Sequence, residues 1–348
     1  MNAETKITKE TKNSIKVEFD RTPFWQRMKA KYLNSFFFTK LIWGIFRYVL
    51  LVGIAYIILY PFFAKVASSF MGPEDFVDAT VKLIPKHFTL DTYKYIILEN
   101  HYIQAIANTT LLSLCCAILQ TFTCAVIGYG FAKFKFKGNG LLFILVIFTM
   151  VIPHPTLQLS MFMQFRYFDV LEIMNLLGGG VFPKFNVTGG MTSFNLTNTY
   201  WPLVILSVTG LAFKNGLYIF MMRQFYKGVP DELEESAYVD GSGVFRTFVQ
   251  IIIPLSIPTM TTVFLFSFCW QWTDSFYTAV FFTKPTIYLM KSIIDIPPSL
   301  DLTYAGTNLY NAAIRNTCGL LIILPLVVLY LFCQRYLIQG IERTGITG

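Results

Sequence analysis

Aromatic, amide and carboxylate side chains meet in one short stretch of an otherwise apolar segment, Trp-Gln-Trp-Thr-Asp at residues 270–274. Aromatic rings stack on the C–H faces of sugars, while amide and carboxylate oxygens accept protons from sugar hydroxyl groups. Gln271, Trp272 and Asp274 are therefore candidates to line a path for a hydroxyl-rich ligand. The alternative is that these groups form hydrogen bonds between helices within a membrane.

Lys214 and Asn215 form a second polar pair inside an apolar segment. An ionised side chain at the centre of a membrane helix costs roughly 2.5–3.5 kcal/mol, so it usually faces a cavity or a partner. Lys214 lies about eight residues, or ~12 Å at ~1.5 Å per residue, from the cytoplasmic end of its segment. We expect Lys214 to line a cavity, and Asn108, Gln120 and Asn215 are weaker candidates for the substrate path. The alternative is that Lys214 snorkels through a locally thinned membrane, and Trp270 is assigned to the interfacial aromatic belt.

Composition places these residues in a polytopic membrane protein. Hydrophobic residues make up 54% of the 348 residues and charged residues 14%, whereas a soluble protein has about 25% charged residues. The formal net charge is +8, but Lys and Arg lie beside apolar segments, where they orient membrane helices rather than bind nucleic acid. The six cysteines lie in apolar runs without C-x-x-C spacing or a neighbouring histidine. We therefore expect buried thiols and no metal site.

Six segments meet the length of roughly 20 apolar residues that a membrane-spanning helix needs. They cover residues 46–64, 106–131, 141–164, 200–222, 258–282 and 317–334. Lys and Arg gather before the first, after the second, between the fourth and fifth, and after the sixth segment. By the positive-inside rule, these regions and both termini are cytoplasmic. The sequence thus predicts an all-α, multi-pass membrane protein.

The chain divides into three predicted parts. Residues 1–44 form a cytoplasmic N-terminal extension, residues 45–338 the membrane domain, and residues 339–348 a cytoplasmic tail. The first 40 residues are polar and Lys-rich, and the apolar segment after them is long enough to span. We therefore expect no cleavable signal peptide.

A polar loop, residues 228–254, separates the fourth and fifth predicted spans. Pro-Asp-Glu-Leu-Glu-Glu at 230–235 favours a short helix whose acids complement the N-terminal end of the helix dipole. Gly241 allows a bend with positive φ, and apolar residues recur at helical spacing over 245–252. We expect two short helices at an angle, with Pro254 bending the chain toward the fifth span. The alternative is an ordinary loop lying on the membrane.

Glu235-Ser-Ala, Gly241 and Ile-Ile-Ile-Pro ending at Pro254 resemble the EAA signature of permease subunits in binding-protein-dependent ABC importers. The resemblance extends from about residue 50 to the end of the chain. Asn-Thr-Thr-Leu-Leu from Asn108, Gly-Tyr-Gly-Phe-Ala-Lys-Phe-Lys-Phe-Lys-Gly at 128–138 and the tail at 334–340 are similar to the carbohydrate-uptake branch. Within that branch, the chain resembles the smaller permease of maltose-type importers.

The resemblance implies a six-helix type I importer domain in a bacterial plasma membrane, with a cytoplasmic coupling helix seated on an ATPase subunit. It assigns ATPase coupling to Glu235, Ser236, Ala237, Asp240, Gly241, Ile251 and Pro254. Glu235 would pair with a basic residue of the ATPase, Ala237 would allow close packing, and Gly241 would supply the bend. Ile251 and Pro254 would stiffen the exit toward the fifth helix. Ser236 departs from the family pattern, which has alanine there.

The same resemblance implies the partners: a second homologous permease, two ATPase subunits, an extracellular solute-binding protein and a sugar, in particular an oligosaccharide, moved by alternating access. We expect no catalytic residue and no cofactor in this chain, because it has no G-x-x-x-x-G-K-[ST] loop, G-x-S-x-G elbow or H-E-x-x-H pair. ATP and Mg would be bound by the ATPase.

Three alternatives stay open. An importer permease for another solute, such as a glycerophosphodiester, would share the resemblance. An ion-coupled secondary transporter would have an inverted repeat and broken helices, neither of which the sequence indicates. A membrane enzyme would need acids or histidines clustered at one face of the membrane, and the three histidines are scattered.

Overall fold

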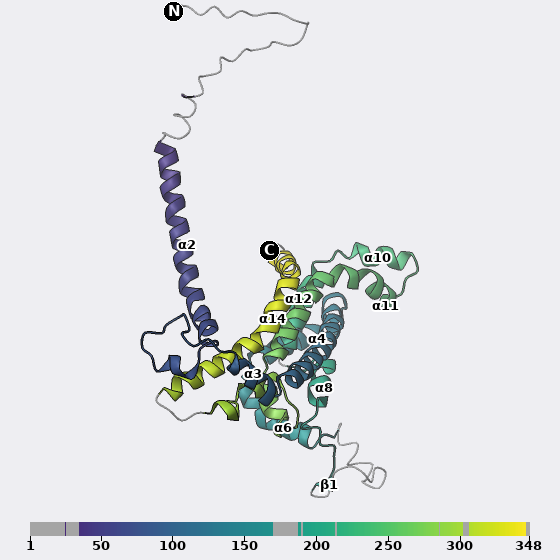
Figure 1. Ribbon diagram of the computed structural model, residues 1–348. Coiled ribbons are helices and arrows are strands. Elements are labelled where there is room, and N and C mark those ends of the chain that lie inside the picture. Colours follow the sequence, from purple (N-terminus) through teal and green to yellow (C-terminus); the bar gives the residue numbers. More distant parts are fainter. Residues whose placement is uncertain are drawn as a thin grey trace, which may run out of the picture. The chain divides into compact units, whose positions relative to one another are not determined.

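The computed structural model describes residues 25, 35–169, 187–188, 191–212, 214–284, 286–301 and 306–345. The described chain is almost entirely helical, which confirms the all-α prediction (Figure 1). The exception is a small hairpin, β1 (Val187–Thr188) paired antiparallel with β2 (Met191–Thr192). Most of the predicted N-terminal extension and part of the loop at 165–199 lie outside the described residues.

The α-helices are α2 (Ser35–Ser68), α3 (Asp91–Glu99), α4 (Tyr102–Lys133), α5 (Asn139–Val151), α6 (Gln158–Arg166), α8 (Trp201–Thr209), α9 (Asn215–Lys227), α10 (Glu232–Val239), α11 (Val244–Thr247), α12 (Ile253–Trp272), α13 (Phe276–Phe281) and α14 (Thr307–Gly345). Short 3-10 helices are η1 (Pro73–Phe76), η2 (His154–Leu157), η5 (Met290–Ile294) and η6 (Pro298–Leu300), and a π-helical turn, η4, covers Phe248–Ile252.

The chain forms two compact units, residues 1–64 and 65–348. Helix α2 supplies most of the described part of the first unit, and its apolar side chains are exposed around the whole helix. The most apolar 18 consecutive residues of this helix have a mean hydropathy of 2.1. A helix that is apolar on all sides is typical of a segment surrounded by lipid or by other membrane helices.

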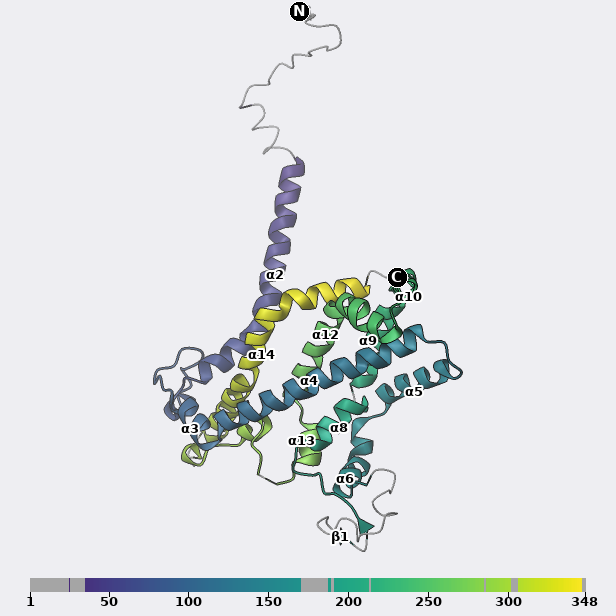
Figure 2. The same ribbon diagram turned by 90° about the vertical axis from the view of Figure 1, so that its right-hand side faces the viewer.

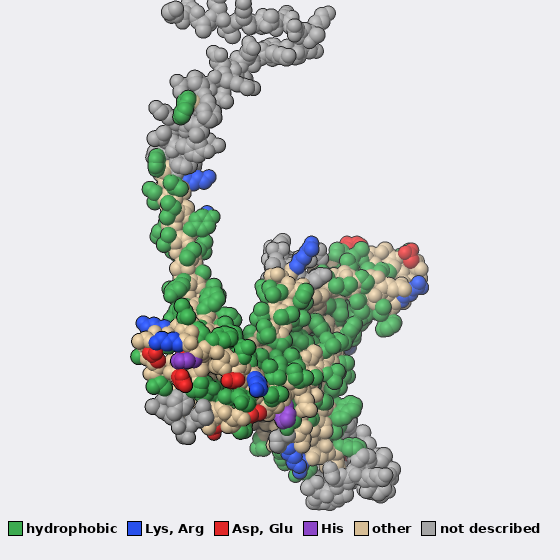
Figure 3. Space-filling view, in the orientation of Figure 1, with side chains coloured by type: hydrophobic (Ala, Val, Ile, Leu, Met, Phe, Trp, Pro, Cys, Tyr) green, Lys and Arg blue, Asp and Glu red, His purple; other side chains and the backbone are tan. Residues whose placement is uncertain are grey.

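Helix α4 is the central element of the second unit, where it packs against α3, α8, α9, α12 and η5 (Figure 2). Three apolar clusters follow one another along it. The first includes Tyr102 and joins the start of α4 to α12 and α14. The second, around Cys124 and Tyr129, joins its other end to α9, and the third, around Leu112 and Cys116, joins its middle to α8 and α13. The surface of the helices is largely hydrophobic, as expected for contact with lipid (Figure 3).

Two of the predicted spans, 141–164 and 200–222, are not continuous helices. The first becomes α5 and α6, which meet at a bend of 100°. Pro153 and Pro155 flank this bend, and a proline removes a backbone donor and clashes with the preceding helical turn. The second becomes α8 and α9 with residues 210–214 between them. The broken helices that the sequence did not indicate are therefore present.

The other helices differ from their predicted bounds in smaller ways. Helix α12 ends at Trp272, ten residues before the predicted end at 282, because Thr273, Asp274 and Ser275 separate it from α13. Helix α14 runs on to Gly345 through most of the predicted tail. In the described part of the chain, four helices are long and apolar enough to cross a membrane, or five if α5 with η2 and α6 counts as one span.

Candidate functional site

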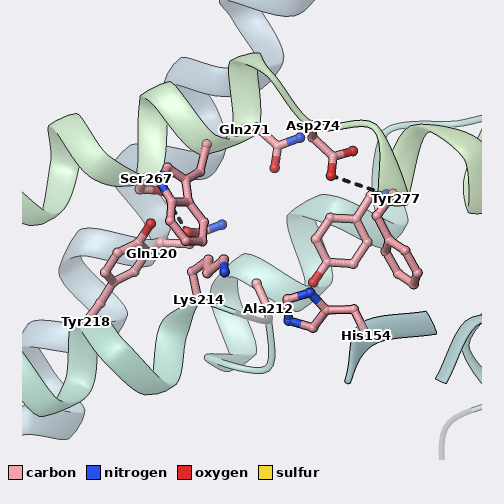
Figure 4. Close-up of a pocket in the computed structure, with 11 residues that line it drawn as sticks. Gln120, His154, Ala212, Lys214, Tyr218, Ser267, Gln271, Asp274 and Tyr277 are labelled. Atoms are coloured by element: carbon pink, nitrogen blue, oxygen red, sulfur yellow. Dashed lines mark hydrogen bonds between the residues drawn. The ribbon is translucent and has the colours of Figure 1, made fainter. Parts of the chain in front are cut away.

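A cavity of about 90 Å3 lies where the interruptions of the helices converge (Figure 4). It is lined by Gln120 of α4, His154 of η2, Ala212 and Lys214 before α9, Tyr218 of α9, Ser267, Trp270 and Gln271 of α12, Asp274, and Phe276 and Tyr277 of α13. His154, Lys214 and Asp274 all belong to the breaks rather than to the interiors of long helices. The breaks therefore bring polar groups into an otherwise apolar helix packing.

Lys214 lies at the N-cap of α9 and faces this cavity, as the sequence predicts. Its ammonium nitrogen is 3.5 Å from the centroid of the Trp270 ring, a cation–π contact. Among the described residues, no carboxylate lies within ion-pair distance of Lys214. The aromatic face thus stabilises the charge without using the hydrogen-bond donors of the ammonium.

Asp274 borders the same cavity, but its carboxylate is already engaged. Oδ1 accepts a hydrogen bond from the backbone N–H of Tyr277 at 3.2 Å, and Oδ2 accepts one from the N–H of Thr278 at 2.8 Å. These bonds cap the start of α13, where a negative charge is favourable. The side-chain amide of Gln271 makes no hydrogen bond to any described residue. Gln271 and Lys214 consequently keep hydrogen-bond donors for a ligand.

The other two predicted path residues do not line the cavity. Trp272 is 3% exposed and belongs to the apolar cluster between α12 and α14. Its indole N–H donates to the carbonyl of Ile322 at 2.9 Å. This matches the alternative of a hydrogen bond between helices. Asn215 is fully buried, and its side-chain oxygen and nitrogen have no hydrogen-bond partner among the described residues.

Gln120 and Trp270 also line the cavity, although Gln120 was only a weaker candidate in the sequence. Gln120 donates from Nε2 to the Ser207 hydroxyl at 3.1 Å and accepts at Oε1 from the Ser267 hydroxyl at 2.6 Å. It therefore joins α4, α8 and α12 beside the cavity. The sequence did contain a signal for this role of Gln120, which is a polar residue in the middle of the apolar run 106–131. Trp270 was assigned to the interfacial belt, but it lines the cavity and contacts Lys214.

The predicted polar loop is a helical hairpin of α10 and α11, which projects from one end of the second unit (Figure 1). Gly241 has φ of +81°, the left-handed conformation that glycine adopts without strain. Its N–H donates to the carbonyl of Tyr238, and the N–H of Ser242 donates to the carbonyl of Ala237 at 2.9 Å. The short acidic helix and the bend at Gly241 are thus both present.

The predicted coupling residues on α10 have different surroundings. Glu235 is exposed and is available to another protein. The Ser236 hydroxyl donates to the carbonyl of Leu233 at 3.1 Å, the local bond that a serine adds where the family pattern has alanine. Ala237 is 6% exposed and packs within its own chain. Asp240 is exposed at the C-cap of α10.

Ile251 and Pro254 lie where the hairpin joins α12. Residues 244–272 are helical without a break over 29 residues, so the chain passes Pro254 within a helix. The π-helical turn η4 directly precedes Pro254. Because proline cannot donate to the carbonyl four residues earlier and clashes with it, the wider turn accommodates the ring without breaking the helix.

The comparisons with known proteins agree with this architecture. The family described as "Binding-protein-dependent transport system inner membrane component" matches residues 125–343, which is more than half of the chain. Protein LplC of Bacillus subtilis is 26% identical over 85% of this chain and 92% of its own. The polygalacturonan/rhamnogalacturonan transport system permease protein YtcP of the same organism is 25% identical over 86% and 96%.

Two further proteins are similar over most of the chain. The arabinooligosaccharides transport system permease protein AraQ of Halalkalibacterium halodurans is 25% identical over 87% of this chain and 98% of its own. A crystal structure of a bacterial ABC transporter involved in the import of the acidic polysaccharide alginate has one chain that aligns with a TM-score of 0.62. That alignment covers 90% of this chain and 99% of the other at 18% identity, which establishes a shared fold.

Proposed function

Because the chain belongs to the family of binding-protein-dependent transport system inner membrane components, we propose that it is the permease subunit of an ATP-driven oligosaccharide importer. A transporter subunit of this kind needs no catalytic residues of its own. ATP hydrolysis would occur in two separate ATPase subunits, which would bind ATP and Mg. A second, homologous permease and an extracellular solute-binding protein would complete the importer in a bacterial plasma membrane.

The continuous helix 244–272 is the observation that carries this proposal. Its first residues belong to the hairpin whose sequence resembles the EAA signature, and its last turn carries Trp270 and Gln271 of the cavity. At ~1.5 Å per residue, the helix extends over roughly 40 Å. A displacement of the hairpin by an ATPase would thus reach the cavity through one rigid element. This arrangement supports alternating access driven from the cytoplasm.

The substrate class rests on the relatives and on the chemistry of the cavity. Three of the relatives are named as permeases for polygalacturonan and rhamnogalacturonan, arabinooligosaccharides or galactooligosaccharides. In this chain, the ammonium of Lys214 and the amide of Gln271 are donors suited to the hydroxyl and carboxylate oxygens of such sugars. The aromatic rings around them suit the C–H faces.

Charge reversal at Glu235 tests the coupling role. We expect Glu235→Lys to abolish uptake of oligosaccharide into proteoliposomes that contain the complete importer, and to reduce co-purification of the ATPase subunits. The control is Glu74→Lys, which reverses an acid that is 77% exposed and distant in the sequence from the hairpin. Wild-type uptake by Glu235→Lys, at equal amounts of incorporated protein, would contradict the assignment.

A further inference from the structure

Lys133, the last residue of α4, has a buried side chain that is only 7% exposed. A lysine at the end of a membrane helix usually extends its ammonium into water. Here the ammonium turns toward the start of the coupling hairpin instead. A buried cation is costly unless it is paired and hydrogen-bonded, so its partners are informative.

The partners of Lys133 belong to both sides of the junction between α9 and α10. The ammonium donates to the carboxylate Oδ1 of Asp231 at 2.6 Å and to the backbone carbonyl of Val229 at 2.7 Å. It also lies 4.0 Å from Oε1 of Glu234. Val229 follows the end of α9, Asp231 is the N-cap of α10, and Glu234 lies in its first turn. One side chain therefore connects the end of α4 to the start of the coupling helix.

The two carboxylates of this cluster differ in their exposure to solvent. Asp231 is exposed, and the hydrogen bond from Lys133 lowers the pKa of its carboxyl group. Glu234 is 7% exposed, and Oε1 of its carboxylate has no hydrogen-bond partner among the described residues. Burial raises the pKa of Glu234, and the charge of Lys133 opposes that rise. Lys133 thus balances a negative charge buried inside the hairpin.

An aromatic layer next to this cluster joins α4 to the elements that precede and follow the hairpin, α9 and η4. The Tyr129 ring, one turn before Lys133, lies 5.6 Å from the ring of Tyr226 on α9 and 4.6 Å from that of Phe248 in η4. Apolar packing is non-directional and tolerates rotation of a short helix. The hydrogen bonds of Lys133 are directional, so they define how α10 is oriented on the end of α4.

We propose that Lys133 is a positioning residue that fixes the coupling helix α10 to α4, so that both move together when an ATPase displaces the hairpin. The proposal rests on the proposed docking of α10 onto an ATPase. It gives the hairpin a second connection to the cavity, because α4 carries Gln120 some 13 residues, or roughly 20 Å, from Lys133. The first connection is the continuous helix 244–272.

The experiment compares Lys133→Met, Lys133→Arg and a control, Lys137→Met, in the complete importer. Lys137 is an exposed lysine four residues away with no partner among the described residues. In proteoliposomes, we expect Lys133→Met to lower the number of substrate molecules imported per ATP hydrolysed by about tenfold, on the scale of a broken charge-assisted contact. Lys133→Arg, which keeps the charge and the donors, should retain most of the coupling, and Lys137→Met all of it.

A second readout measures the position of α10 without transport. Hydrogen exchange of the backbone amides at 232–239 is recorded on the full-length permease in lipid nanodiscs. We expect exchange at these residues to become on the order of tenfold faster in Lys133→Met and to stay unchanged in Lys137→Met. If the importer lacks ATP-driven transport altogether, the proposed function fails, while hydrogen exchange still decides whether Lys133 holds α10.

Loss of Lys133 leaves the carboxylate of Glu234 buried without a cation, and this could reduce the amount of folded protein. The double variant Lys133→Met/Glu234→Gln removes the uncompensated charge. We expect it to restore the yield of assembled importer while exchange at 232–239 stays fast and coupling stays low. Wild-type exchange and wild-type coupling in this double variant, or in Lys133→Met itself, would overturn the proposal.

Discussion

At the scale of single residues, the cavity shows how a charge is retained inside a membrane protein. Lys214 is stabilised by the Trp270 ring, and Asp274 by the backbone N–H groups that begin α13. Each ion has its own means of stabilisation, so neither needs the other. The carboxylate oxygens of Asp274 already accept hydrogen bonds, whereas the ammonium of Lys214 keeps its hydrogen-bond donors. The cavity therefore presents a positive group to a ligand.

This asymmetry leads to a prediction for Lys214. We expect Lys214→Met to lower the initial rate of oligosaccharide uptake by about tenfold, since a hydrogen bond to a charged group contributes ~1.5–3 kcal/mol. Lys214→Arg should retain more activity because it keeps the charge over Trp270. Uptake of a labelled oligosaccharide into proteoliposomes gives the measurement. Equal uptake by wild type and Lys214→Met would exclude Lys214 from the substrate path.

At the scale of elements, the position of α4 depends on its close approach to α9. A side chain at Gly128 would place its Cβ 2.7 Å from Cβ of Met222 and 3.0 Å from the backbone nitrogen of Arg223. These distances leave no room for a larger residue. The two helices can therefore pack only because this position is glycine, and the buried residues around Cys124 depend on that contact.

Gly128→Leu tests this contact. We expect it to destabilise the permease by ~1–3 kcal/mol, because an overpacked interface forces the helices apart. The measurement is the thermal unfolding of the purified protein in detergent. Gly140→Ala is the matched control, since a Cβ there meets nothing within 4 Å and alanine favours the helix α5. An unchanged melting temperature for Gly128→Leu would show that α4 and α9 tolerate separation.

At the scale of the whole molecule, the distribution of charge predicts the orientation in the membrane. The hairpin of α10 and α11 follows the Lys- and Arg-containing end of α9, while the loop after α2 has mixed charge with acids such as Asp75 and Asp78. Lys86 donates to Asp78 at 2.6 Å and lowers the pKa of its carboxyl group, and the buried carboxylate of Asp75 accepts from the N–H of His87. The loop is thus an ordered polar structure, consistent with a place outside the membrane.

Cysteine labelling measures the orientation directly. We expect Ile84→Cys, in the loop after α2, to react with a membrane-impermeant maleimide added to intact cells, and Val239→Cys, at the end of α10, to react only after the cells are opened. Both positions are well exposed, at 82% and 87%. The native cysteines are buried or half-buried, so the unmodified protein is the background control. Labelling of Val239→Cys in intact cells would contradict the predicted topology.

The sequence predicted the hairpin better than the cavity, for a physical reason. The acids that begin α10 and the positive φ of Gly241 depend on neighbouring residues, and both were foreseen. The interruption of α5 and α6 also has a local cause in Pro153 and Pro155, although its bend of 100° exceeds an ordinary kink. Trp272 could not be separated from Trp270 by residue type. The direction of each side chain depends on where α14 and the cavity lie.

The sequence by itself determined that this is a helical membrane protein and which loop carries the coupling signature, because hydropathy, charge bias and turn residues act over short distances along the chain. Only the tertiary structure decided which polar residues meet. Lys214, Gln120 and Gln271 come together because three helices end or pass at one point. Lys133 reaches Asp231 across 98 residues of sequence. Such contacts follow from the packing of α4 against its neighbours, which no local pattern contains.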